Sequence, residues 1–181
     1  MKKIINILLL LLILILFQGY RKQVQNPDDD VQCNGKLYKT SMGDVCVQPD
    51  DPKDILRVYM WVYMYYLYDN FDQKRVPFSG RKYSNKRLYN IYRYTIHKDG
   101  SITDLHPIVK ENDEFDEHVK NLILDNPPAK FIDGLPEEIK VELEVVQTAG
   151  EESLGGTGYK WSDYYNIGFE KGYFNSEKDH F

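Results

Sequence analysis

Residues 88–109 read LYNIYRYTIHKDGSITDLHPIV, and this stretch decides the fold. Two runs rich in β-branched and aromatic residues flank the pair Asp99 and Gly100. Such a pair between two such runs is typical of a β-hairpin with a two-residue turn, whose central residues both need a positive φ. Pro107 has no amide hydrogen to donate, so the second strand is expected at a sheet edge or to end early.

A helix and a further strand are expected after this hairpin. Asn112 or Asp113 can cap the helix, and Asn126 followed by two prolines ends it. Its apolar residues share one face: Phe115, Val119, Leu122 and Ile123. Residues 138–146 then alternate strictly between apolar and charged side chains, which predicts a half-buried strand. The apolar members of that strand are Ile139, Val141, Leu143 and Val145.

Another helix is expected before the hairpin, where Asp51 can act as the cap and Pro52 fits the first helical position. Its apolar residues populate nearly all sides, so it should be buried on more than one face. Residues 51–147 therefore predict an α+β domain, with a small antiparallel sheet made of the hairpin plus the C-terminal strand, packed against two helices.

The first 18 residues, MKKIINILLLLLILILFQ, predict an export segment that precedes this domain. An uncleaved transmembrane helix is favoured over a signal peptide, because no A-x-A-like cleavage site follows the apolar run. The two lysines are expected to stay in the cytoplasm, so the rest of the chain is exported. Residues 19–50 are a polar linker carrying Cys33 and Cys46, which are predicted to form a disulfide in an exported protein.

The C-terminal residues 148–181 combine glycines with many aromatic residues, and their aromatic spacing is helical. Glycines on the same face weaken a helix, so a flexible tail is expected, with docking onto the domain or a partner as the alternative. The formal net charge of −5 disfavours nucleic-acid binding. No catalytic, cofactor or metal-ligand motif is recognisable in the sequence, which predicts a protein that is not an enzyme.

Three segments together resemble the C-terminal domain shared by TonB and TolA proteins. They are YRYTIHKDGSITDLHPIV, FDEHVKNLI and GLPEEIKVELEV. In that family an Asp-Gly hairpin, a hydrophobic-Asp pair opening a helix and a Pro-containing turn follow one another. The matching pairs in this chain are Asp99 with Gly100, Phe115 with Asp116, and Leu135 with Pro136.

The resemblance implies a single-pass protein of the bacterial inner membrane whose C-terminal domain lies in the periplasm. It implies binding of outer-membrane or periplasmic proteins, without cofactors, in energy transduction or transport across the envelope. An exposed sheet edge accepts an extended peptide as a further strand. The strand with Ile139, Val141, Leu143 and Val145 is expected to be that edge. A homodimer stays open, as does an exported scaffold or adhesin-like protein that acts through its aromatic tail.

Overall fold

The computed structural model describes residues 33–48, 52–71, 87–149, 158–160 and 163–173. All of them belong to one compact unit, Cys33–Phe181. Neither helix in this part of the chain is long and apolar enough to cross a membrane. The predicted anchor at residues 1–18 lies outside the described residues.

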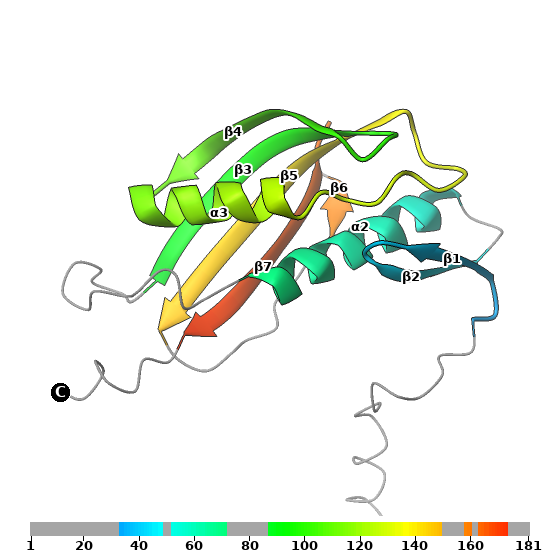
Figure 1. Cartoon of the computed structure of the whole chain (residues 1–181), viewed down its shortest axis with the longest axis horizontal. Helices are drawn as coiled ribbons and strands as arrows, with labels where there is room; N and C mark the ends of the chain where they lie inside the picture. The colour runs from blue at the N-terminus through cyan, green and yellow to red at the C-terminus, as the bar shows by residue number, and fades with distance from the viewer. Residues whose placement is uncertain (1–32, 49–51, 72–86, 150–157, 161–162, 174–181) are drawn as a thin grey trace, which may run out of the picture. The chain divides into compact units, whose positions relative to one another are not determined.

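The architecture is α+β, with two helices on one face of a five-stranded sheet (Figure 1). The strand order is β4-β3-β5-β7-β6. The strands are β3 (Arg87–His97), β4 (Ile102–Lys110), β5 (Glu138–Ala149), β6 (Tyr159–Lys160) and β7 (Tyr165–Tyr173). Neighbours are antiparallel except β5 and β7, which are parallel. The expectation of a small, wholly antiparallel sheet of three strands is therefore wrong.

The predicted hairpin is confirmed as β3 and β4, but its predicted turn is wrong. The His97 amide donates to the Ser101 carbonyl at 2.9 Å, and the Gly100 amide donates to the His97 carbonyl at 2.8 Å. Between these residues only Gly100 has a positive φ, of 86°. The loop therefore has three residues and resembles the type in which one left-handed residue follows a turn.

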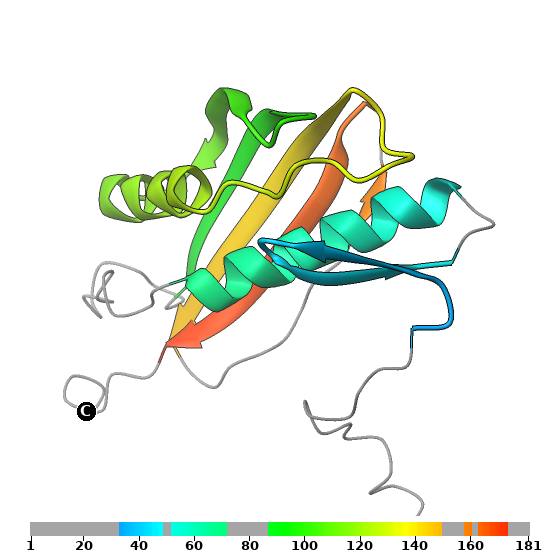
Figure 2. The same ribbon diagram turned by 45° about the vertical axis from the view of Figure 1, so that its right-hand side comes forward.

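Both predicted helices are present, as α2 (Pro52–Asn70) and α3 (Asp113–Asp125). Asn112 caps α3, because its side chain accepts a hydrogen bond from the Phe115 amide at 2.8 Å. The four apolar residues predicted for one face of α3 are all buried. Figure 2 shows α3 over β3 and α2 over β5 and β7, so the helices share the apolar face of the sheet.

The core between the helices and the sheet contains an unusual share of tyrosine. Four tyrosine side chains are almost fully buried: Tyr59, Tyr63, Tyr92 and Tyr94. Their hydroxyl groups keep polar partners, as buried hydroxyls require. Tyr59 donates to the Ala129 carbonyl, Tyr92 donates to Asp116 Oδ1 at 2.6 Å, and Tyr94 donates to the Tyr63 hydroxyl at 3.4 Å.

The two cysteines form the predicted disulfide, Cys33–Cys46. It closes a separate hairpin made of β1 (Lys36–Thr40) and β2 (Gly43–Val47). The inner face of this hairpin is buried, with Val45 and Val47 almost inaccessible, and β2 contacts α2. The cysteine loop is thus part of the folded unit, and the prediction of a polar linker is wrong for this segment.

The expectation of a flexible tail is wrong for residues 159–160 and 165–173, which form β6 and β7. The side chains of Tyr165, Ile167 and Phe169 are buried on the helix side of β7. Glycine, which argued against a helix, allows a close approach in the sheet. A Cβ atom at Gly168 would lie only 2.9 Å from the Glu144 carbonyl oxygen.

β5 is a half-buried strand, as its alternation predicts, but its expected place at the sheet edge is wrong. It pairs with β3 along one side, from Glu138 to Thr148, and with β7 along the other, from Val141 to Ala149. Its residues Ile139, Val141, Leu143 and Val145 are buried against the helices. The backbone of this strand is therefore not free to receive a partner.

Candidate protein-binding edge of the sheet

One outer edge of the sheet is β4, and its backbone is irregular. Pro107 lacks an amide hydrogen, and the pairing with β3 shifts register twice. Asp104 has a φ of 56°, which is rare for a residue other than glycine. Prolines and bulges at an edge hinder the addition of another strand. The position of Pro107 at an edge confirms the prediction from its sequence.

The other outer edge is formed by β7 together with the two residues of β6. β6 pairs only with Tyr165 and Asn166. From Ile167 to Tyr173, the outer side of β7 has no strand partner among the described residues. We call this stretch the open edge. Its seven residues are long enough for a short extended peptide to pair with.

The open edge is held in place by α2. The Lys171 ammonium donates to the Tyr68 carbonyl at 2.8 Å, near the C-terminal end of the helix, and lies 4.1 Å from the centre of the Tyr68 ring. A cation at this end of a helix also interacts favourably with the helix dipole. The Tyr68 and Phe169 rings meet edge to face with their centres 5.6 Å apart. The side chains on the helix side of β7 are therefore fixed before any partner arrives.

Two aromatic side chains of α2 lie exposed along the same border. Trp61 is 38% exposed and Tyr65 is 45% exposed, with ring centres 5.9 Å apart. A Cβ atom at Gly158, just before β6, would lie 3.0 Å from Trp61 Nε1. Trp61, Tyr65 and Tyr68 follow one stripe of the helix, since they are spaced by four and three residues. We call Trp61 and Tyr65 the aromatic shelf; it runs from β6 toward the open edge.

The opposite face of the sheet is polar beside the open edge. Glu144 on β5 lies next to Gly168, and Glu170 lies two residues further along β7. Neither carboxylate forms an ion pair among the described residues, whereas the neighbouring Glu142 binds Arg93 at 2.8 Å. We call Glu144 and Glu170 the acidic pair.

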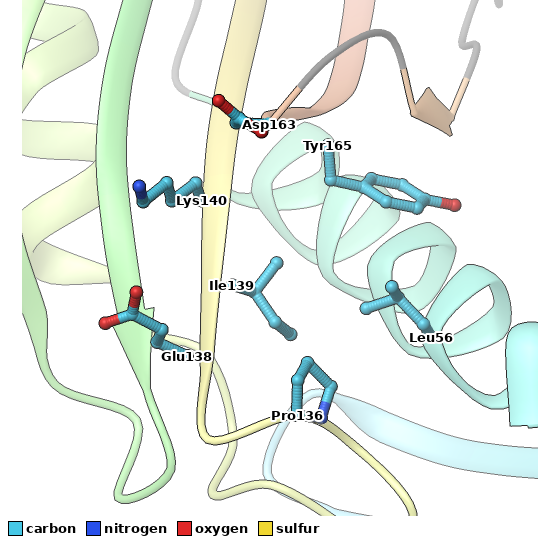
Figure 3. Close-up of a pocket in the computed structure, with 7 residues that line it drawn as sticks. All are labelled: Leu56, Pro136, Glu138, Ile139, Lys140, Asp163 and Tyr165. Atoms are coloured by element: carbon cyan, nitrogen blue, oxygen red, sulfur yellow. The ribbon is translucent and has the colours of Figure 1, made fainter.

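A small groove of about 240 Å³ lies where β5 and β7 begin (Figure 3). Ile139 and Tyr165 point into it, beside Leu56 of α2, whereas Lys140 and Glu138 point to the other side of β5. Burial raises the pKa of the Tyr165 hydroxyl. The groove is smaller than typical small-molecule sites of about 300–1,000 Å³, so it suits one inserted side chain.

The six motif residues behind the TonB/TolA resemblance do not gather into one site. Asp99 and Gly100 form the hairpin loop, and Leu135 and Pro136 precede β5. Gly100 cannot carry a side chain, because a Cβ atom there would lie 2.6 Å from the Pro128 carbonyl oxygen. Phe115 is fully buried at the start of α3. These residues build the scaffold, and none of them belongs to the open edge.

Asp116 joins α3 to the sheet. Its Oδ1 accepts from the Tyr92 hydroxyl at 2.6 Å and from Asn90 Nδ2 at 3.1 Å, and its Oδ2 lies 3.4 Å from the Lys110 ammonium. Asp113 binds the same lysine at 3.0 Å, but its side chain is 95% exposed.

Replacing Asp116 by alanine is expected to lower the free energy of unfolding by about 2 kcal/mol, because the buried Asn90 and Tyr92 lose the carboxylate that accepts from them and Tyr92 keeps only the longer contact of 3.3 Å with the backbone carbonyl of residue 116. Asp113→Ala is the matched control and should cost at most about 0.5 kcal/mol. Urea unfolding of both variants measures the difference, and equal losses would contradict the network.

The sequence carried a signal for β7 that the helical reading missed. Buried residues Tyr165, Ile167 and Phe169 alternate with Asn166, Gly168 and Glu170, which is the period of a strand.

The described residues contain no group of three metal-ligating side chains. Comparison with known proteins finds no matching family model, curated protein or solved structure.

Proposed function

We propose that this protein is a membrane-anchored, exported binding module that takes up an extended segment of an envelope protein as an added strand. The observation that carries the proposal is the open edge, Ile167–Tyr173, lying beside the aromatic shelf. Main-chain hydrogen bonds to β7 would supply affinity, and the flanking side chains would supply specificity. The anchor, the periplasmic location and a role in energy transduction or transport belong to the same proposal and rest on the sequence.

Strand addition is expected at β7 and not at β4, because the backbone of β4 is irregular. Pro107 and the left-handed Asp104 interrupt the regular ladder that an incoming strand needs. β7 carries no proline and is regularly paired with β5 along its whole length. The alternative, an exported scaffold or adhesin-like protein that acts through its aromatic tail, is less favoured, because two aromatic side chains of that tail, Tyr165 and Phe169, are buried within the domain.

Site-specific cross-linking tests the proposal in intact cells. Both native cysteines are engaged in the disulfide, so a single added cysteine is the only free thiol. Tyr65→Cys probes the helix side of the open edge, and Glu170→Cys probes the opposite side. We expect both to cross-link to one short segment of the same partner, at positions an odd number of residues apart, since successive side chains of a strand face opposite sides.

Thr103→Cys, exposed on β4, is the matched control at the other edge. It should give no cross-link to that segment. Cross-links from position 103 alone, or links from 65 and 170 to unrelated partner regions, would contradict strand addition at β7.

A further inference from the structure

The side chains beside the open edge differ sharply on its two faces. On the helix side lie Trp61 and Tyr65, which offer exposed aromatic surface. On the opposite side lie Glu144, which is exposed, and Glu170, which is partly exposed. An incoming strand presents alternate side chains to these two environments.

We infer that the segment added to β7 alternates basic residues, facing Glu144 and Glu170, with apolar or aromatic residues, facing Trp61 and Tyr65. This inference rests on the proposed function and names the chemistry of its partner. Opposite charges directly across neighbouring strands stabilise pairing, and like charges oppose it. Aromatic side chains on the shelf favour apolar or aromatic neighbours in the same way.

Gly168 makes the Glu144 carboxylate accessible to the incoming strand, because no side chain on β7 stands between them. It pairs with Glu144 and has no side chain of its own, and a Cβ atom there would lie 3.0 Å from the Glu144 Cβ. A lysine or arginine opposite Gly168 can therefore pass over it to the Glu144 carboxylate. Glu170 meets its partner directly. Two basic side chains, spaced by two residues, are thus accommodated on one face.

A second copy of this chain fits the same edge poorly. A two-fold antiparallel pairing of the seven open residues would be centred on residue 170. It would place Glu170 opposite Glu170 of the other copy, and like charges directly opposite each other are destabilising. Without Lys2 and Lys3, the chain has 21 basic and 28 acidic residues, a net charge of −7, which also favours a basic partner.

Two blocked nine-residue peptides test the inference against the full chain in detergent. One alternates lysine and valine, and the other has glutamate in place of lysine. We expect the lysine peptide to bind about tenfold more tightly and to slow hydrogen exchange of residues 167–173. Glu170→Lys leaves Glu144 as the only carboxylate of the acidic pair and should therefore remove most of this preference. Glu117→Lys, an equal charge change on the exposed face of α3, should leave it unchanged.

The outcomes separate this inference from the proposed function. If both peptides protect β7 and bind with equal affinity, strand addition at β7 stands, but the preference for basic residues facing Glu144 and Glu170 is overturned. An unchanged preference in Glu170→Lys would overturn it as well. If neither peptide protects β7 and positions 65 and 170 give no cross-links, both this inference and the proposed function are overturned. Protection of β7 that grows with protein concentration in the absence of peptide would instead identify a second copy as the occupant.

Discussion

Raising the pH above 11 is expected to unfold this domain, because four core tyrosines cannot ionise without leaving the interior. Tyr59, Tyr63, Tyr92 and Tyr94 have at most 1% of their surface exposed. Burial raises the pKa of each of the four hydroxyls above the ordinary value of about 10. For Tyr92, the nearby Asp116 carboxylate raises the pKa further.

The sign of the effect follows from proton linkage. In the unfolded chain these tyrosines lose their protons above pH 10, whereas in the folded protein they keep them. The unfolded state therefore binds fewer protons, and stability falls as the pH rises. Each tyrosine costs about 1.4 kcal/mol for every further pH unit, so four cost about 6 kcal/mol at pH 11 and about 11 kcal/mol at pH 12. A domain with a stability of about 6–11 kcal/mol, which is within the usual range, therefore unfolds between pH 11 and pH 12.

Circular dichroism and the ultraviolet absorbance of tyrosinate, followed together, measure this transition. Exposed tyrosines should ionise first, near pH 10, and the buried ones only as the fold is lost. Tyr63→Phe removes one of the four groups and should reduce the steepness of the stability loss by about a quarter. Tyr65→Phe, two residues away on α2 but 45% exposed, is the matched control and should not change it. Ionisation of all tyrosines near pH 10 with the fold intact would contradict the buried cluster.

Local signals in the sequence are sufficient for much of this fold. α3 could be predicted because its Asn112 cap and its one-sided apolar stripe act within a few residues of each other. The β3–β4 hairpin and the alternation of β5 are also local. The turn type was harder, since Asp-Gly also suits a three-residue loop, and only the backbone at Gly100 distinguishes the two.

The binding edge could not be predicted, because it depends on a distant pairing. Whether β5 is an edge or a central strand is decided by β7, which pairs with it in parallel and is joined to it through residues 150–164. Parallel strands need a long connection, so the sequence between them contains no short turn motif from which their pairing could be predicted. Gly168 looked like a helix breaker, yet it fits because the Glu144 backbone lies so close. The aromatic shelf likewise becomes visible only once α2 is placed beside β7.

Phe115→Ala is expected to lower the free energy of unfolding by about 3–5 kcal/mol, the cost typical of removing a buried phenyl ring. Phe115 is fully buried at the start of α3. Leu124→Ala on the same helix removes a side chain that is 48% exposed and should cost at most about 0.5 kcal/mol. Phe115→Leu, which keeps most of the volume, should lie between them. Urea unfolding measures all three, and a small loss for Phe115→Ala would contradict its place in the core.

The same substitution should also loosen the open edge. Phe71, just after α2, meets Phe115 edge to face at 6.4 Å and Phe169 of β7 at 5.7 Å. Removing the Phe115 ring takes away one neighbour of Phe71, and through it weakens the packing behind β7. Hydrogen exchange of residues 167–173 should therefore accelerate in Phe115→Ala by more than its loss of global stability accounts for, whereas in Val45→Ala, a smaller truncation in the β1–β2 hairpin, it should follow the global loss. Acceleration in proportion to the global loss in both variants would mean that the core supports the edge only through global stability.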